Sequence, residues 1–323
     1  MSDQTSDAPS EQITISAQMR LSESELAEVL ALKRVCDEAE GLDLKLGFGA
    51  AEPATARYPA VFLARAGQRL VGYGSLDGDE ATAETCAMIH PDWRRRRLGF
   101  RLFEAARAGF RAAGGEQLFA VCEDASTSGR SFLRMLAGQR AFSEHRMVWR
   151  SGAAPSPTPP SDFSVERARP EDLRPLAVAL SHAFDHGEER LLADLTTNSA
   201  IATEQVYIAR HAGAIIGGFR LSILPDSTGI YAFGIDRSYQ RRGWGRQMLA
   251  RACALATAQG APRVSLEVDT DNAPAIALYQ ASGFAIITTY GYYIFSKTLL
   301  ALGLDLDEGG RLRDPATGAT GDK

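Results

Sequence analysis

A glycine-containing loop in the second half of the chain joins a predicted strand to a predicted helix. The strand, IYAFGID from Ile230 to Asp236, is mostly apolar, and an amphipathic helix pattern begins near Trp244. Between them, Gly243 and Gly245 let the backbone curl closely around an anion, and the helix start offers unpaired N–H donors. Three arginines could add charge-assisted bonds: Arg241, Arg242 and Arg246. The pattern predicts a phosphate site, although a tight helix-entry turn has the same glycines.

Two motifs in this half resemble one enzyme superfamily. Gln240-Arg-Arg-Gly243-Trp-Gly245 resembles the Q/R-x-x-G-x-G/A loop with which GNAT acyltransferases bind the pyrophosphate of acetyl-CoA. The block LEVDTDNAPAIALYQASGF, from Leu266 to Phe284, is similar to that superfamily's strand, Asn, helix, Leu-Tyr and Gly-Phe order. Because both motifs occur at the usual spacing, the second half is identified as a GNAT domain, with acetyl-CoA or another short acyl-CoA as implied co-substrate. The first half resembles the superfamily only weakly.

The resemblance implies a role for each matching residue. The backbone of three strand residues would hold the pantetheine arm and the acyl carbonyl: Phe233, Gly234 and Ile235. The loop would hold the pyrophosphate through Gln240, Arg241, Arg242, Gly243, Trp244, Gly245 and Arg246. Asn272 would contact the cofactor arm, and Tyr279 would protonate the departing thiolate. A phenol with a pKa of about 10 keeps its proton at pH 7 and can donate it, whereas packing on the sheet is the alternative role for Tyr279.

The acceptor amine must lose a proton before it attacks a thioester. A lysine-like amine with a pKa near 10.4 is neutral about once in 2,500 molecules at pH 7, a penalty of roughly 4.6 kcal/mol. An α-amino group with a pKa near 8 costs only about 1.4 kcal/mol to deprotonate. Glu267, on the opposite strand face from Leu266 and Val268, is the best candidate for the base, directly or through water. Pairing with a nearby arginine is the other role that this position allows.

The composition of the 323-residue chain fits two globular domains. Residues 151–164, SGAAPSPTPPSDFS, have the composition of an extended linker. We therefore predict an N-terminal GNAT-like domain at 13–150 and a catalytic GNAT domain at 165–299. Residues 1–12 are expected to be disordered and residues 300–323 to form a flexible tail. The resemblance implies an α/β (α+β) fold for each domain, a mixed and mostly antiparallel sheet flanked by helices whose two central strands splay apart.

The two halves repeat one pattern. VFLARAGQRLVG at 61–72 aligns with VYIARHAGAIIG at 206–217, and IHPDWRRRRLGF from Ile89 aligns with IDRSYQRRGWGR from Ile235. A helix and a strand follow in both halves, at 101–113 and 117–121 in the first and at 246–259 and 263–268 in the second. The halves are therefore predicted to be tandem copies of one domain.

The first half has different residues at the positions that match the candidate site of the second half. Aligning Ile89 with Ile235 places Arg97 where the second half has Gly243. Aligning Gly138 with Gly283 places Arg134 at the tyrosine position and Gln139 where Phe284 stands. Arg94 to Arg97 could still bind a phosphorylated ligand or nucleic acid, but a solvated basic helix entry explains them as well. We expect this half to be structural, or to hold CoA, without catalysis.

Composition and charge exclude several other classes of protein. Forty acidic against 35 basic residues argue against a general nucleic-acid binder, and no apolar run is long enough for a membrane span. The polar N-terminus does not have the pattern of a secretory signal, so we expect a cytoplasmic protein. Four dispersed cysteines suggest buried thiols, and His182 and His186, the one histidine pair at helical spacing, lack a third ligand, so no metal site is expected.

These observations predict an enzyme that moves a short acyl group from acyl-CoA to the primary amine of a small molecule. Direct attack in a ternary complex is expected, without a covalent acyl-enzyme. The tandem architecture is similar to that of mycothiol synthases, which acetylate the cysteinyl amine of a small thiol precursor. A non-catalytic acyl-CoA sensor or scaffold and a protein or peptide N-acetyltransferase are the alternatives. The sequence indicates neither the acceptor nor the oligomeric state.

Overall fold

The computed structural model describes residues 12–47, 58–78, 81–150, 162–184, 186–224 and 227–295. The chain forms two compact units, and their boundaries differ from the predicted 13–150 and 165–299. Unit 1 combines the chain up to Phe142 with the chain from Tyr290 onward, and unit 2 runs from Ser143 to Thr289. The predicted N-terminal segment 1–12, linker 151–164 and tail 300–323 lie outside the described residues, apart from Gln12 and 162–164.

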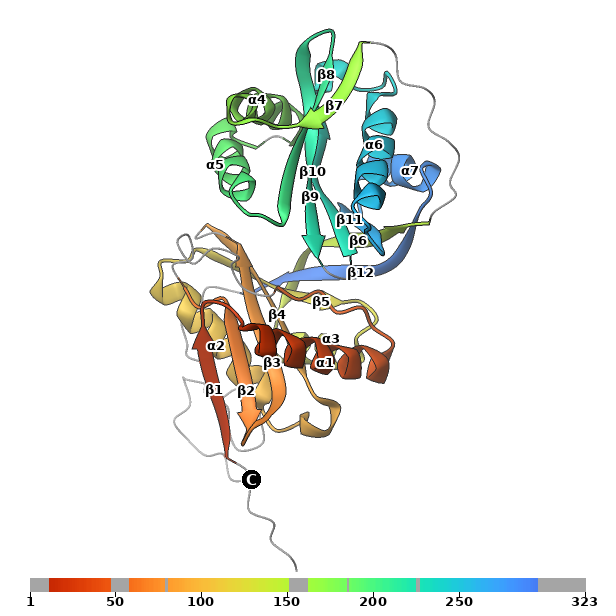
Figure 1. Ribbon diagram of the computed structural model, residues 1–323. Helices are drawn as coiled ribbons and strands as arrows, with labels where there is room; N and C mark the ends of the chain where they lie inside the picture. The colour runs from red at the N-terminus through yellow and green to blue at the C-terminus, as the bar shows by residue number, and fades with distance from the viewer. Residues whose placement is uncertain are drawn as a thin grey trace, which may run out of the picture. The chain divides into compact units, whose positions relative to one another are not determined.

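Unit 1 is a mixed sheet with helices on both faces (Figure 1). Its described strands lie in the order β1-β2-β3-β4-β5-β12, with β4 and β5 parallel and the other neighbours antiparallel. The elements are β1 (Ile13–Gln18), α1 (Glu23–Glu40), β2 (Val61–Ala66), β3 (Arg69–Gly78), β4 (Thr82–Ile89), η1 (Pro91–Trp93), α2 (Leu98–Ala112), β5 (Gln117–Glu123), α3 (Thr127–Met135) and the end of β12 (Phe284–Ile294).

Unit 2 repeats this arrangement in the order β6-β11-β10-β9-β8-β7, with β10 and β11 parallel. The elements are the end of β6 (Gln139–Trp149), β7 (Phe163–Arg167), η2 (Pro170–Asp172), α4 (Leu173–Phe184), α5 (Glu188–Ser199), β8 (Glu204–His211), β9 (Ala214–Leu224), β10 (Ser227–Ile235), η3 (Arg237–Tyr239), α6 (Trp244–Ala258), β11 (Val264–Asp269) and α7 (Ala273–Ala281). The predicted mixed, mostly antiparallel sheets with flanking helices are therefore confirmed.

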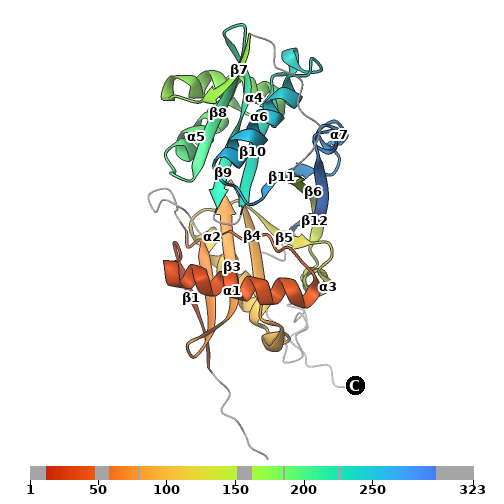
Figure 2. The same cartoon turned by 45° about the vertical axis from the view of Figure 1, so that its right-hand side comes forward.

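Alternating side chains of the strands build two core layers in each unit. In β8, Val206 and Ile208 pack under α4 and α5, whereas Tyr207 and Ala209 pack in the cluster that contains the buried side of α6. Unit 1 follows the same rule, and Figure 2 shows α1 lying across its strands. The alternation places a helix layer on each face, so the loops between strands and helices gather at the ends of the sheets.

The central parallel strands of both units diverge, as the resemblance to the GNAT fold implies. β10 pairs with β11 only through Thr228–Ile230 and Val264–Leu266, although both strands continue beyond these residues. In unit 1, β4 and β5 pair through 82–85 and 117–120 before they separate. Each unit therefore has a wedge between its two parallel strands, and within it the backbone groups of the two strands do not hydrogen-bond to each other.

Each unit completes its sheet with a strand from the other half of the sequence. Residues Ser143–Trp149 of β6 follow the first half in the chain but belong to unit 2, where Ser265–Asp269 pair with 144–148. Tyr290–Tyr293 of β12 follow the second half but pair with β5 in unit 1. Among the helices of the described residues, none is both long and apolar enough to cross a membrane.

Candidate active site

The loop after β10 has the backbone conformation that the glycine pattern predicts. Gly243 stands immediately before α6 with φ of 88° and ψ of −5°, in the left-handed region that side chains disfavour. A Cβ atom at Gly243 would meet no atom within 4 Å, so the free space beside the glycine is available to a ligand. Arg241 is also left-handed, with φ of 64°. The two left-handed residues turn the chain back sharply into the helix.

The start of α6 is suited to an anion. No side chain caps its first turn, whereas Asn272 caps α7 by accepting a hydrogen bond from the Ala275 N–H at 3.2 Å. Arg241 and Arg246 are exposed and have no ion-pair partner among the described residues, and Arg242 lies 5.7 Å from the Tyr239 ring. Free N–H donors and unpaired guanidinium groups together favour phosphate-type ligands.

A β-bulge interrupts β10 just before this loop. The pairing of β10 with β9 joins Tyr231 to Arg220 and Gly234 to Gly218, so two residues, Ala232 and Phe233, face a single residue of β9. Ala232 adopts φ of 47°, an unfavourable value for a residue with a Cβ atom. The bulge frees backbone groups of β10 at the place where the strand separates from β11.

The bulge brings β10 against the predicted proton donor. The rings of Phe233 and Tyr279 are 6.0 Å apart between centroids, and Tyr279 also contacts Phe284. Tyr279 is only 6% exposed, and burial raises its pKa to about 12. Among the described residues no hydrogen bond uses its hydroxyl, which is therefore free to donate to a ligand.

Glu267 lies on the face of β11 opposite to Tyr279. Leu266 and Val268 belong to the core cluster that contains Tyr279, so the partly buried Glu267 between them points toward the α4 and α5 face. Its register partner on β6 is Arg146. The structure therefore places the predicted acid and base on opposite faces of the sheet, with an arginine beside the base.

Three other predicted cofactor residues have structural tasks. Gln240 donates from Nε2 to the Ile235 carbonyl at 2.8 Å and so closes the loop onto the end of β10. The Trp244 side chain is stacked on Phe163 at 5.1 Å between ring centroids and is 8% exposed, which leaves its backbone N–H for a ligand. Asn272 uses its Oδ1 to cap α7.

Gly234 sets the position of helix α4. A Cβ atom there would lie 2.7 Å from the Phe184 ring and 3.0 Å from Leu180, closer than real side chains approach. The missing side chain allows α4 to lie directly on β10 beside the bulge. This glycine is needed for close helix packing, in addition to the cofactor role that the resemblance implies.

An Asp–His pair that the sequence analysis did not predict joins α4 to the loop. His182 Nδ1 lies 2.7 Å from Asp236 Oδ2, and Asp236 Oδ1 accepts hydrogen bonds from Ser238 N and Oγ at 2.8 and 2.6 Å. Burial alone would raise the pKa of Asp236, but the hydrogen bonds from Ser238 and His182 hold it below its ordinary value. The Asx turn at Asp236 was the available sequence signal.

The loop of the first half has almost the same backbone. Arg95 and Arg97 adopt φ of 63° and 59°, matching Arg241 and Gly243. Arg94 donates from Nε to the Ile89 carbonyl at 3.2 Å, as Gln240 does to Ile235. β4, however, pairs with β3 without any register shift. The first half has kept the loop and has no bulge.

The predicted alignment of Arg134 with Tyr279 is wrong by one residue. Ala137, with φ of 50°, ends α3 and donates to the Arg134 carbonyl, just as Gly283 ends α7 and donates to Gln280. This match places the buried Leu133 at the tyrosine position and Gly138, rather than Gln139, at that of Phe284. The shared glycine misled the alignment because an alanine occupies the left-handed position. The first half still lacks a proton donor.

Comparison with known proteins agrees with this geometry. Residues 173–284 match the model of the Acetyltransferase (GNAT) family. A mycothiol acetyltransferase of Thermomonospora curvata is 29% identical over 225 residues, which cover 67% of this chain and 75% of that protein. A mycothiol acetyltransferase of Catenulispora acidiphila is 27% identical over 309 residues, covering 84% of this chain and 96% of that protein.

Solved structures show the same fold. A GCN5-related N-acetyltransferase from Sphaerobacter thermophilus aligns with a TM-score of 0.67 at 17% identity, covering 87% of this chain and 95% of that one. A tandem GNAT protein from the clavulanic acid biosynthesis pathway aligns with a TM-score of 0.63 at 18% identity, covering 88% of this chain and 98% of that one. The tandem arrangement is therefore found in a solved relative of the fold.

Proposed function

We propose that the second half of this chain, which matches the GNAT acetyltransferase family, transfers a short acyl group from acyl-CoA to the primary amine of a small molecule. One observation carries the proposal: the β10 bulge brings the Phe233 ring to 6.0 Å from the Tyr279 ring, and the loop after β10 leads into a helix start that no side chain caps. The site thus offers an anion position at the start of α6, a free backbone edge on β10 and a proton donor in α7.

The residues of this site fit acetyl-CoA. The uncapped start of α6, the left-handed Gly243 and the exposed Arg241 and Arg246 would hold the pyrophosphate. The bulge at Ala232 and Phe233 and the strand end up to Ile235 would hold the pantetheine arm in the wedge between β10 and β11. When bound, acetyl-CoA supplies an acyl group activated as a thioester.

Backbone and tyrosine would share the chemistry. An N–H group at the bulge is positioned to polarise an acyl carbonyl, since the extra strand residue has no partner in the ladder. As the new C–N bond forms and the C–S bond breaks, the Tyr279 hydroxyl gives its proton to the sulfur and regains one from solvent. Burial favours this role because it keeps the phenol neutral at every physiological pH.

The amine is proposed to approach from the α4 and α5 face. Glu267 points to that face and would take the amine proton directly or through water, with Arg146 next to it in register. An α-type amine with a pKa near 8 costs only about 1.4 kcal/mol to deprotonate, so it asks less of a single carboxylate than a lysine does. The relatives named mycothiol acetyltransferase support a small acceptor of this class.

Calorimetric titration with acetyl-CoA, followed by a thiol-release assay over a panel of small amines, tests the proposal. We expect binding to the wild-type protein, loss of binding in Gly243→Glu, and CoA release with an α-amine acceptor. Binding without turnover on any small amine or peptide would instead support an acyl-CoA sensor. Turnover on peptides alone would support a peptide N-acetyltransferase, and no binding at all would refute the transferase assignment.

A further inference from the structure

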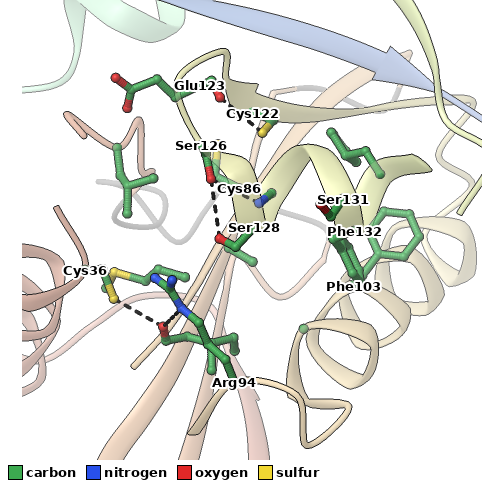
Figure 3. Close-up of a pocket in the computed structure, with 18 of the residues that line it drawn as sticks. Cys36, Cys86, Arg94, Phe103, Cys122, Glu123, Ser126, Ser128, Ser131 and Phe132 are labelled. Atoms are coloured by element: carbon green, nitrogen blue, oxygen red, sulfur yellow. Dashed lines mark hydrogen bonds between the residues drawn. The ribbon is translucent and has the colours of Figure 1, made fainter. Parts of the chain in front are cut away.

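The first half encloses a cavity in the wedge between β4 and β5. Its volume is about 780 Å³, within the range of small-molecule pockets. Three buried thiols, Cys36, Cys86 and Cys122, line it together with aromatic side chains such as Phe103 and Phe132 (Figure 3). Burial raises the pKa of Cys36 to about 11 and that of Cys122 to about 12, so these thiols are neutral. The cavity takes the place that the cofactor cleft has in the second half.

A carboxylate on the wall of this cavity has partners on two different elements. Glu40, the last residue of α1, forms an ion pair with Arg94 of the β4–α2 loop. Its other contacts are at the start of α3, where it accepts hydrogen bonds from Ser128 Oγ at 2.6 Å and Ser126 Oγ at 3.2 Å. Figure 3 shows Arg94 on one side of the cavity and the two serines on the other. Glu40 therefore bridges the two walls between which a pantetheine arm would pass.

Helix length explains why only the first half has this bridge. α1 has eighteen residues and α4 has twelve, so α1 is longer by roughly 9 Å at 1.5 Å per residue. In the second half, Gln240 occupies the position of Arg94 and Asn272 that of Ser126. Neither bonds a carboxylate among the described residues. The longer helix carries Glu40 to both the loop and α3, whereas α4 contacts its own loop through His182 and ends at Phe184.

The bridge is charged at neutral pH. Burial alone would raise the pKa of Glu40, but hydrogen bonds from Ser128 and the Arg94 guanidinium hold it below its ordinary value. The side chains of Arg94 and Glu40 are 26% and 15% exposed, so water screens the pair less than a surface pair. Glu123, a second carboxylate on the cavity wall, is 4% exposed and accepts a hydrogen bond from the Asp43 N–H at 2.8 Å. An anionic ligand in this cavity would therefore meet two carboxylates on its walls, and one of them, Glu40, is bonded to the loop.

We propose that Glu40 is an internal anion that excludes phosphate-bearing acyl carriers from the first-half cleft. It pairs with Arg94, the first of the four consecutive arginines of the loop, and it closes the path between the loop and α3. The chain consequently binds one acyl-CoA, in its second half. The location of that single site rests on the proposed function, but the exclusion from the first half does not.

Calorimetric titration with CoA alone tests the exclusion in four proteins: the wild type, Glu40→Ala, Glu38→Ala and the double variant Gly243→Glu/Glu40→Ala. Glu38 is an exposed carboxylate on the same helix and serves as the matched control. We expect one site in the wild type and in Glu38→Ala, two in Glu40→Ala, and one in the double variant. Glu40→Gln keeps the side-chain length but removes the charge, and should raise the affinity of the first-half site at least about tenfold if Glu40→Ala does not fold.

The outcomes separate this inference from the proposed function. A wild-type protein that binds none while Glu40→Ala binds one would refute the second-half cofactor site and keep the exclusion. Two sites in the wild type, of which Arg97→Glu removes one, would overturn the exclusion. An unchanged number of sites in folded Glu40→Ala and Glu40→Gln would overturn it as well.

Discussion

The two halves of this chain differ much more in chemistry than in backbone. Both loops pass through two left-handed residues before a helix, at Arg95 and Arg97 in the first half and at Arg241 and Gly243 in the second. The first half keeps this turn although Arg97 costs roughly 1–2 kcal/mol there relative to glycine. Loop conformation is held by the strand and helix at its ends, so it persists after the residues that bind a ligand have changed.

The differences lie in three features that surround the loop. β10 has a bulge and β4 has none, α7 has a buried tyrosine where α3 has Leu133, and α1 places Glu40 where α4 places nothing comparable among the described residues. Under the proposed function, the first half therefore lacks three things that the second half offers: the free backbone edge, the proton donor and the open cleft. The comparison teaches that a similar fold and loop do not suffice to assign a working site.

Removal of the proton donor should have the largest effect. We expect Tyr279→Phe to lower kcat by about 10²–10⁴-fold while the KM for acetyl-CoA stays nearly unchanged, because the hydroxyl acts on the leaving sulfur. Steady-state kinetics measure both constants. Tyr207→Phe, which removes another hydroxyl of unit 2 that donates to Gln205, should leave kcat within about twofold. An unchanged kcat in Tyr279→Phe would remove the tyrosine from its proposed role.

A glutamate introduced at the matching loop positions, 243 and 97, should affect acetyl-CoA binding differently in the two halves. We expect Gly243→Glu to weaken acetyl-CoA binding by at least about tenfold, since it adds left-handed strain of roughly 1–2 kcal/mol and a like charge beside the pyrophosphate. Arg97→Glu at the matching position should change the affinity by less than about twofold. Calorimetry reads both variants. Equal losses in the two variants would mean that the first-half loop also holds the ligand.

The base should have a smaller effect, and one that depends on pH. For an α-amine acceptor, Glu267→Gln should lower kcat/KM at pH 7 by about tenfold, and the loss should shrink above pH 8 as the amine itself becomes neutral. Because the pKa of Tyr279 is raised to about 12, the neutral donor persists and the alkaline plateau should extend to about pH 11 in both proteins. A rate that falls between pH 8 and 10 would identify a different group as the proton donor.

Glycine at the bulge should have the smallest effect, a change in thermal stability. The change should have the opposite sign when glycine is placed in the regular strand of the first half. Ala232→Gly should raise the thermal midpoint by about 1–3 °C, because glycine relieves the left-handed strain at φ of 47°. Ala87→Gly lies in the regular part of β4 and should lower the midpoint by a similar amount, since glycine weakens a strand. Calorimetric melting of both variants measures the contrast. A lower midpoint for Ala232→Gly would mean that the bulge is not under strain.

Local patterns predicted the elements and the loop, because they depend on neighbouring residues. The helix expected at 246–259 is Trp244–Ala258, and the strand expected at 263–268 is Val264–Asp269. The bulge was not predictable, because an extra residue in β10 is defined only by its pairing with β9. The His182–Asp236 contact joins residues 54 positions apart, so the local Asx turn at Asp236 indicates the turn but not its histidine partner.

The alignment error at Gly138 has a similar physical cause. A glycine is the usual left-handed residue after a helix, so identical glycines in the two halves seemed equivalent. In the structure Ala137 has that conformation, which tertiary packing can impose on an alanine. The Glu40 bridge was equally hidden, because it depends on how far α1 extends toward a loop that follows it by more than fifty residues.

The exchange of β6 and β12 bears on how such a chain can evolve. A gene cut at residues 151–164 would leave the second half without Ser143–Trp149, exposing β11 as an unpaired edge, and the first half without Tyr290–Tyr293 beside β5. Unpaired edges favour aggregation, so neither fragment should be inherited as a free-standing domain. Selection for an activity in either half would thus preserve the other half as well, because deletion of either would remove a strand from its sister.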